Sequence, residues 1–515
     1  MRKCEPPRAA TVSEIASGPT PDAISGDQSI GTWSVATEVT ETHLSILFFV
    51  GERVYKLRKP VDFGFVDFTR RQARQEDCTR EVTLNRRLAP DVYIGVADVL
   101  IDGEAVDHMV VMRRMPKDRQ LATLARRGDD LGVWLTQVAQ TIVAFHRRAE
   151  RSLEISAAAT GAALRAAWDA NASESAPFLN SILDAELDGE LQELADRWLS
   201  GRVRLFDARI ASGKVCDGHG DLQAEDIFCL DDGVRILDCL EFSDRLRFGD
   251  VCADVAFLAM DLERLGRLDA AGQFLEQYRE LADDQFPESL LHYYVALRAY
   301  VRAKVACLRV QQGDEAPRAQ ARQLHQLALD HLRRAQVAVV LIGGLPGSGK
   351  STIATGLART RGWRLISSDV VRQEMFRGQD VTSAFGTGRY APEVTGAVYA
   401  ELLSRAEDLL ATGESVVLDA SWIDSARREE ARLMASAGKS NFIELCCRVH
   451  PDTAQDRLVR RLAVGGDPSE ATPEVRRAMG EAMDPWSSSI VIDTTVATAE
   501  ESIGKVGRIV TAKSM

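Results

Sequence analysis

The pattern of apolar and polar positions divides the chain into three stretches. From residue 33 to 112, short apolar runs alternate with polar residues, which is typical of strands. From 131 to 336, apolar residues recur mostly at helical spacing, and a block of short strands at 215–239 interrupts them. Beyond 336, strand-like and helix-like runs alternate, so we predict a mixed α/β and α+β protein. In the first stretch the expected strands are 44–50, 53–57, 96–101 and 109–112, and the expected helix is 69–88.

The third stretch opens on the clearest chemistry. Residues 344–351 read Gly-Leu-Pro-Gly-Ser-Gly-Lys-Ser, the phosphate-binding pattern G-x-x-x-x-G-K-[ST], between a strand-like and a helix-like run. Glycines let backbone N–H groups close around phosphate oxygens, Lys350 can reach the outer phosphates, and Ser351 can offer its hydroxyl to Mg²⁺. A glycine-rich turn that binds nothing is the alternative, but strand, loop, Lys-Ser pair and helix all agree. The expected nucleotide-binding residues are Gly344, Gly347, Ser348, Gly349, Lys350, Ser351 and Thr352.

This context predicts a three-layer αβα P-loop domain with a parallel sheet at 336–515, binding ATP or GTP. The 515 residues are enough for two or three domains, and we read residues 1–30 as a flexible tail without a secretory signal. The net charge of −13, from 63 basic and 76 acidic residues, disfavours a general nucleic-acid or anionic-membrane binder. No apolar run approaches the roughly 20 residues of a bilayer span. The nine cysteines form no spaced metal-ligand set, which favours free thiols and a cytoplasmic protein.

The short-strand block carries a second constellation. It reads His219-Gly220-Asp221 and continues to a strand that delivers Asp238. Here the chain resembles the aminoglycoside phosphotransferase-like kinases, which share the bilobal protein-kinase fold. The resemblance implies that Asp221 is the catalytic base and that Asp238 holds Mg²⁺ on the nucleotide phosphates. It covers about residues 30–330, from which we expect a kinase-like domain at 31–330 with a small lobe at 31–115 and a helical lobe at 116–330.

The small lobe fits the same resemblance. Lys56 lies in an expected strand and Glu81 in the following helix, and a strand lysine paired with a helix glutamate positions the α- and β-phosphates in this fold. Three features depart from the family. Asp226 stands where an asparagine metal ligand is expected, and Gln223 stands where the loop has a second histidine. No G-x-G-x-x-G covers the phosphates, so loop 41–45 would have to serve.

Alternatives remain open for this domain. The His-Gly-Asp tripeptide alone is a weak signal, His219 could be structural, and Asp238 could cap a turn. A nucleotide-binding regulatory domain without catalysis would keep the same fold. The ordered set is far more specific than any of its members: Lys56, Glu81, Asp221, Asp226 and Asp238.

In the C-terminal domain, Asp369 ends an expected strand and Arg372 follows three residues later. This domain resembles the gluconate kinase, polynucleotide 5′-kinase and zeta-toxin-like group. The resemblance implies that Asp369 is the general base for an acceptor hydroxyl and that Arg372 contacts the acceptor. A helix N-cap at Asp369 is the alternative, and the two roles are compatible.

Asp419 ends an apolar strand in the position that supports Mg²⁺ in P-loop proteins. A plain strand-end aspartate is the alternative. Arg457 and Arg461 share a helix face. The resemblance implies that they form a lid over the transferred phosphoryl group, although a solvated helix surface would carry the same pattern.

We therefore predict two fused phosphotransferase modules that use ATP and Mg²⁺ and phosphorylate a hydroxyl of a small molecule. The whole resembles a fused family of bifunctional phosphotransferase/ATP-binding proteins, which fixes neither acceptor. The main alternative is a P-loop kinase or nucleotide switch that a catalytically weak kinase-like domain regulates. Polynucleotide 5′-end phosphorylation is disfavoured by the acidic net charge, and the sequence indicates no oligomeric state.

Overall fold

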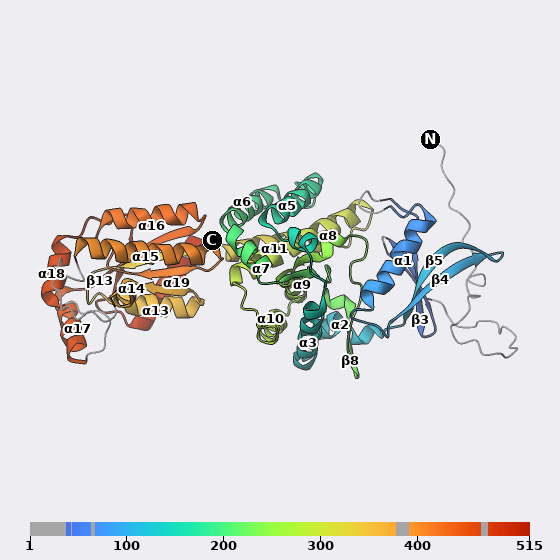
Figure 1. The fold of residues 1–515 in the computed structure, drawn as a ribbon, viewed down its shortest axis with the longest axis horizontal. Coiled ribbons are helices and arrows are strands. Elements are labelled where there is room, and N and C mark those ends of the chain that lie inside the picture. The colour runs from blue at the N-terminus through green and yellow to red at the C-terminus, as the bar shows by residue number, and fades with distance from the viewer. Residues whose placement is uncertain (1–37, 43, 63–66, 377–390, 465–471, 515) are drawn as a thin grey trace. The chain divides into compact units, whose positions relative to one another are not determined.

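The computed structural model describes residues 38–42, 44–62, 67–376, 391–464 and 472–514, with the side chains of 461–464 and 514 left out. The predicted tail at 1–30 lies outside these residues. The chain divides into two compact units: unit 1 comprises residues up to 156 together with 215–284, and unit 2 comprises 157–214 together with 285–515. Figure 1 shows their helices and strands, with labels where there is room.

Unit 1 contains an antiparallel sheet in the order β1-β2-β3-β5-β4. Strands β4 and β5 are joined by the two-residue turn Asp102-Gly103, where both residues have positive φ (53° and 84°), as a type I′ hairpin turn requires. Helix α1 packs on β4 and β5. The bounds are β1 (Glu38–Glu41), β2 (Ser45–Val50), β3 (Arg53–Arg58), α1 (Arg71–Asn85), β4 (Tyr93–Ile101) and β5 (Glu104–Arg113).

The rest of unit 1 is helical, with two small antiparallel pairs, β6 with β9 and β7 with β8. One apolar cluster joins Val82 of α1, Val110 of β5 and Phe228 of β7, so the sheet and the β7–β8 hairpin share a core. The bounds are η2 (Lys117–Arg119), α2 (Leu121–Arg127), α3 (Gly132–Arg148), α4 (Leu153–Ala157), β6 (Val215–Asp217), η4 (Ala224–Asp226), β7 (Ile227–Leu230), β8 (Gly233–Ile236), α8 (Asp244–Arg247), β9 (Phe248–Asp250), α9 (Val251–Arg264) and α10 (Leu268–Ala282).

The helices that precede the phosphate-binding loop in unit 2 come from two separate stretches of the chain, residues 157–214 and 285–335. Thr160 and Asp184 cap the first two of them, each accepting a hydrogen bond from a backbone N–H of the first turn. Helices α11 and α12 pack along each other as an antiparallel pair. The bounds are α5 (Gly161–Ser175), η3 (Ala176–Phe178), α6 (Ala185–Gly201), α7 (Val203–Ala211), α11 (Glu288–Gln311) and α12 (Arg318–Ala335).

The remainder of unit 2 is a three-layer αβα domain. Its five strands are all parallel, in the order β11-β12-β10-β13-β14. All six residues of the central strand are buried and apolar, as expected for a parallel strand covered on both faces. The strands are β10 (Ala338–Gly343), β11 (Arg364–Ser367), β12 (Val416–Asp419), β13 (Asn441–Arg448) and β14 (Ile490–Asp493).

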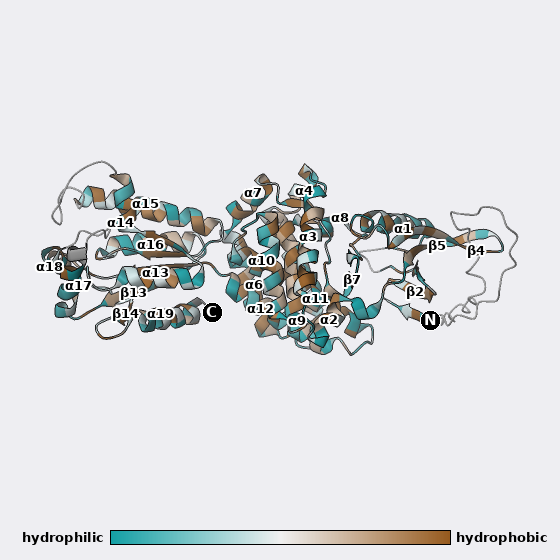
Figure 2. Cartoon of the chain, turned by 90° about the horizontal axis from the view of Figure 1, so that it is seen from below, coloured by the Kyte–Doolittle hydropathy of each residue, from teal (hydrophilic) through white to brown (hydrophobic). Residues whose placement is uncertain are grey.

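Helices cover both faces of this sheet. One apolar cluster joins it to α15 and α16, and a second joins it to α13 and α19, so each face has its own core (Figure 2). The fold class predicted from the sequence is therefore confirmed. The helices are α13 (Lys350–Arg361), α14 (Ser368–Met375), α15 (Pro392–Ala411), α16 (Ser425–Ala437), α17 (Pro451–Val464), α18 (Pro473–Glu481) and α19 (Ala499–Ser514).

Within unit 2, buried polar contacts join the early helices to the αβα domain. The fully buried Arg202, which follows α6, donates to the carbonyl of Gly438 at 3.0 Å and to the hydroxyl of Ser440 at 3.2 Å. Burial, together with the charge of Arg197, lowers the pKa of Arg202 to about 10. Ser289 of α11 donates to the carbonyl of Gly413 at 2.7 Å. These contacts fix the helices against the start of β12 and β13.

We expect Leu341→Ala, on the central strand, to lower the free energy of unfolding of unit 2 by about 2–5 kcal/mol, because Leu341 is fully buried in an apolar cluster. Denaturant unfolding followed by circular dichroism measures the change. Leu433→Ala on α16 is the matched control: its side chain is 56% exposed, so the same truncation should cost about 0.5 kcal/mol or less. Equal losses in the two variants would contradict the assigned core.

Candidate functional site

The phosphate-binding loop lies between β10 and α13, where a parallel sheet presents the carboxyl ends of its strands. Gly344, Gly347 and Gly349 have φ of 137°, 78° and 80°, which side chains rarely adopt. A Cβ on Gly344 would lie 2.5 Å from the carbonyl oxygen of Cys447 and 2.7 Å from the hydroxyl of Ser348. The loop geometry therefore requires the glycines, and α13 starts at Lys350 directly behind them.

Asp419 stands beside this loop at the end of β12, in register with Ile342 of β10. Burial raises the pKa of Asp419, while the charge of Lys350 and the hydroxyl of Ser351 oppose that rise. Its Oδ1 is buried and has no hydrogen-bond partner among the described residues. A carboxylate oxygen left without a donor beside a serine hydroxyl fits a hard cation such as Mg²⁺ and its water shell. Ser351 and Asp419 thus suit the metal roles predicted for them.

Two further residues of the predicted nucleotide site, Ser348 and Thr352, differ in how far they are buried. Ser348 is 1% exposed, and its hydroxyl has no partner among the described residues. Thr352 is exposed in the first turn of α13. An unsatisfied hydroxyl inside a glycine loop is consistent with a phosphate-binding role for Ser348.

Asp369 and Arg372 lie on α14, near Asp419. Ser367 occupies the N-cap, so Asp369 stands inside the first turn and is not the capping residue. Arg372 is buried and donates to Asp369 at 3.3 Å. The charge of Asp369 contributes to the raised pKa of Asp419, so α14 brings its carboxylate close to the end of β12.

Arginines approach the loop from the opposite side. Arg457 of α17 donates to the carbonyl of Gly347 at 3.4 Å and to the hydroxyl of Thr494 at 3.1 Å. Thr494 in turn donates to the carbonyl of Ser348 at 2.8 Å. Arg461 lies on the same helix, but its side chain is outside the described residues.

The sequence reasoning missed a third arginine. Arg476 of α18 donates to the carbonyl of Pro346 in the loop. Burial lowers the pKa of Arg476, as expected for a cation removed from water. Its place in a helix far beyond the loop motif gave no signal, although the pair Arg476-Arg477 is a short basic run of the kind that contacts phosphate.

In unit 1, the predicted lysine and glutamate meet. Lys56 of β3 contacts Glu81 of α1 at 2.8 Å and Asp238 at 2.9 Å. Burial alone would lower the pKa of Lys56, but the carboxylates of Asp238 and Glu81 outweigh it and raise the pKa. Glu81 is fully buried, whereas the Asp238 side chain is half-exposed. One cation therefore bridges an inner carboxylate and an outer one.

Asp238 has a backbone conformation that few non-glycine residues adopt. Its φ is 61°, and its N–H donates to the hydroxyl of Tyr93 at 3.1 Å. Such strain persists only where the surroundings enforce it, and it is concentrated at functional sites. Asp226 stands at the same open end of the β7–β8 hairpin, because its carbonyl accepts from the N–H of Leu237 at 2.9 Å.

A carboxylate of α9 anchors the loop that carries Asp221. The buried carboxylate of Asp254 accepts from the N–H groups of His219 at 2.6 Å and Gly220 at 2.9 Å, and contacts His146 at 3.2 Å. Burial would raise the pKa of Asp254, but these hydrogen bonds and His146 hold it well below its usual range. The carboxylate therefore remains charged and fixes two consecutive peptides of the loop.

His219 is fully buried and its Nε2 lies 3.1 Å from the carbonyl of Leu237. Burial lowers the pKa of His219, which favours a neutral, structural imidazole. Gln223 donates to Oδ2 of Asp221 at 2.9 Å. The residue that departs from the family pattern thus orients the candidate base.

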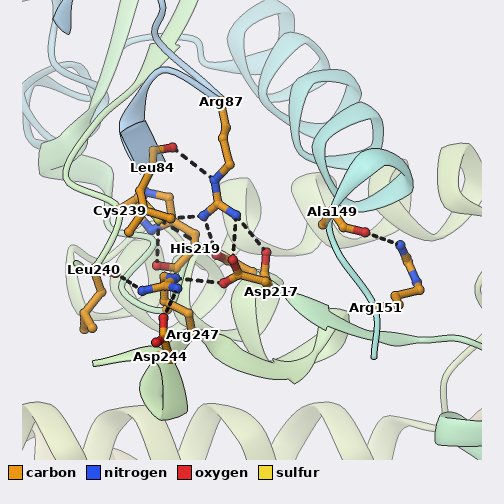
Figure 3. Close-up of polar contacts among 12 residues, drawn as sticks. Leu84, Arg87, Ala149, Arg151, Asp217, His219, Cys239, Leu240, Asp244 and Arg247 are labelled. Atoms are coloured by element: carbon orange, nitrogen blue, oxygen red, sulfur yellow. Dashed lines mark hydrogen bonds and ion pairs between the residues drawn. The ribbon is translucent and has the colours of Figure 1, made fainter. Parts of the chain in front are cut away.

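Figure 3 shows a second support that the sequence did not reveal. Asp217, at the end of β6, is held between Arg87 at 3.0 Å and Arg247 at 2.7 Å. Arg87 also contacts the sulfur of Cys239 at 3.1 Å, and Arg247 donates to the carbonyl of Leu240 at 3.0 Å. The two arginines therefore join the strand before the Asp221 loop to the segment after Asp238.

The loop at 41–45, predicted to cover the phosphates, forms a turn. The N–H of Ser45 donates to the hydroxyl of Thr42 at 3.0 Å, and that hydroxyl donates to the carbonyl of Ser45 at 3.1 Å. His43 lies outside the described residues. The described cysteines are all buried, and none is in a disulfide. Among the described helices, none has the length and apolar composition needed to cross a bilayer.

Comparisons with known proteins bear on the P-loop region and on the chain as a whole. A family model described as an AAA domain matches residues 339–486, which contain the phosphate-binding loop, Asp369 and Asp419. The chain is 38% identical over 476 residues to "Uncharacterized protein Rv2004c" of Mycobacterium tuberculosis, covering 92% of the chain and 95% of that protein. The same values relate it to "Uncharacterized protein Mb2027c" of Mycobacterium bovis. The chain therefore belongs to the family of these mycobacterial proteins.

Solved structures are more distant. A choline/ethanolamine kinase family protein from Mesorhizobium loti is 10% identical, with 58% of this chain and 93% of that chain covered and a TM-score of 0.36. A gluconokinase from Sinorhizobium meliloti 1021 is 16% identical, with 35% and 98% covered and a TM-score of 0.25. TM-scores this low support no conclusion about function.

We expect Gly218→Ala to distort the Asp221 loop, because a Cβ there would lie 2.4 Å from Oδ2 of Asp254. Overpacking of this kind costs about 1–3 kcal/mol. The measurement is thermal unfolding together with Mg-nucleotide affinity in protein whose P-loop is disabled by Lys350→Ala. Gly249→Ala in β9, where nothing lies within 4 Å of the added Cβ, is the control and should behave like the parent protein. A silent Gly218→Ala variant would contradict the anchoring role of Asp254.

Proposed function

We propose that the chain is an ATP-dependent phosphotransferase with two kinase-type modules, each of which transfers the γ-phosphoryl group of ATP to a hydroxyl of a small molecule. One observation supports this most strongly. Each unit places a lysine beside a carboxylate suited to Mg²⁺: Lys56 lies 2.9 Å from Asp238, and the charge of Lys350 acts on the buried Asp419. The modules we propose are the sequence-defined ones, 31–330 and 336–515.

In the P-loop module, Asp369 would accept the proton of the acceptor hydroxyl. The acceptor oxygen then forms a bond to the γ-phosphorus as the bond from that phosphorus to the β–γ bridging oxygen breaks, and ADP leaves. Arg372 would contact the acceptor, while Lys350, Arg457 and Arg476 would neutralise charge on the transferred group. Ser351 and Asp419 would hold Mg²⁺, which would supply positive charge against the phosphates.

In the kinase-like module, Asp221 would accept the acceptor proton, and its orientation depends on Gln223. Lys56, paired with Glu81, would bind the α- and β-phosphates, and Asp226 with Asp238 would supply the metal ligands. Both side chains are hard oxygen donors, so they suit Mg²⁺. The acidic net charge of −13 supports small molecules rather than nucleic acid as acceptors. A cytoplasmic location stays a prediction.

A second function is favoured by Gln223 and Asp226. Gln223 occupies the Asp221 oxygen Oδ2 with a hydrogen bond, and Asp226 stands where the kinase pattern has a neutral metal ligand. Unit 1 would then bind nucleotide without fast transfer, and the P-loop module would be the kinase or nucleotide switch that it regulates.

Transfer of labelled γ-phosphate from MgATP into a small-metabolite extract tests both functions. We expect two labelled products, one lost in Asp221→Asn and the other lost in Lys350→Ala, since each substitution removes one module's charged group. Labelling that ignores Asp221→Asn and disappears with Lys350→Ala would refute the two-kinase proposal and support the regulatory one. ATP binding without any labelled product would support the switch.

Arg476→Ala should weaken MgATP binding to the P-loop module about 10- to 100-fold, because it removes a charge-assisted contact beside the phosphates. Isothermal titration in the Lys56→Met background, which removes the proposed phosphate-binding cation of unit 1, measures the dissociation constant. Arg477→Ala, which removes the exposed neighbouring guanidinium, should leave affinity unchanged. An equal loss of affinity in the two variants would mean that the positive charge of α18 as a whole, and not the contact of Arg476 with the loop, supports MgATP binding.

A further inference from the structure

A second cation lies behind the nucleotide lysine of unit 1. Lys56 and Arg58 are two residues apart on β3, so their side chains leave the same face of the strand. They share one carboxylate: Oε1 of Glu81 lies 2.8 Å from Lys56, and Oε2 lies 2.8 Å from Arg58. Arg58 is 2% exposed and therefore far from bulk water.

The Arg58 guanidinium makes contacts on every side. Its Nε donates to Asp77 at 2.6 Å and its Nη1 donates to Ser45 at 2.8 Å. Its Nη2 donates to Glu81 and to Glu241. These partners come from β2, from α1 and from the segment that follows Asp238. One planar group therefore joins three parts of the chain that each contribute to the candidate site.

The surrounding carboxylates explain why a cation must be there. Asp77, Glu81 and Glu241 are all buried, and their oxygens lie within 4.8 Å of one another. Three such carboxylates resemble a metal-binding set, but Arg58 contacts all three and supplies the positive charge itself. Its fixed fork of donors also sets the direction of each carboxylate, which a lysine cannot do.

We infer that Arg58 is a positioning residue for the nucleotide site of unit 1. It fixes Glu81 and, through Glu241, ties the segment after Asp238 to β3. Glu81 then stays in place when Lys56 turns from Asp238 towards a phosphate and Asp238 becomes free for the metal. This inference rests on the proposed nucleotide binding by unit 1, and it assigns Arg58 no contact with the substrate.

The test uses the full chain with Lys350→Ala, so that MgATP binding reports unit 1. Arg58→Lys keeps the charge but loses the fork, and Glu241→Gln keeps the shape of its side chain but loses its charge. We expect each to raise the dissociation constant for MgATP about tenfold, at temperatures well below the unfolding transition. Arg53→Met, which removes an exposed arginine at the other end of β3, is the control and should not change affinity.

A purely structural role predicts a different result: a lower unfolding temperature with unchanged MgATP affinity in the folded protein. That outcome, in both Arg58→Lys and Glu241→Gln, would overturn the inference while leaving the proposed function intact. If the Lys350→Ala protein itself fails to bind MgATP, the proposed nucleotide site of unit 1 is wrong, and the inference falls with it.

Discussion

Buried charge that must be matched is the constraint on which both candidate sites depend. An ionised group removed from water is costly unless opposite charge or hydrogen bonds replace its hydration. Unit 1 meets this cost with two cations, Lys56 and Arg58, set among carboxylates from α1 and from the segment after β8. Unit 2 meets it only in part, since the buried Asp419 keeps one oxygen without a donor among the described residues. A site that binds a charged ligand needs this kind of incomplete compensation, because the ligand supplies the remainder.

The backbone is controlled by the same means. Asp254 binds two consecutive N–H groups of the Asp221 loop, and the adjacent Gly218 leaves no room for a Cβ. Among the described residues, no carboxylate is found in that role at the phosphate loop, which instead uses glycines in conformations that other residues avoid. A loop that binds an anion presents its own N–H groups to it, so a carboxylate there would compete with the ligand. The two loops therefore differ in anchoring because one presents a carboxylate and the other presents N–H groups.

The sequence predicted those features whose signal is local. The phosphate loop is eight consecutive residues, and the helix expected at 69–88 is α1, Arg71–Asn85. The Lys56–Glu81 pair followed from resemblance to a known pattern. Contacts without a local signal escaped: Arg476 and Pro346 are 130 residues apart, and Arg58 and Glu241 are 183 apart. Helices at 157–214 and 285–335 pack with the P-loop domain in unit 2, a grouping that hydrophobic periodicity cannot reveal because it identifies a buried face without identifying its partner.

The departure at Asp226 bears on whether unit 1 handles a metal. Asp226 and Asp238 both stand at the open end of the β7–β8 hairpin. The aspartate at position 226, where the kinase pattern has an asparagine, therefore adds negative charge there. Lys56 offsets one such charge, and Arg58 is fully engaged with the carboxylates behind it. Like charges at one site disfavour each other unless a cation intervenes. A divalent cation satisfies that requirement better than a proton near neutral pH, since the Lys56 charge lowers the pKa of Asp238. Under the proposed function, Asp226 therefore increases the electrostatic demand for Mg²⁺ at this site.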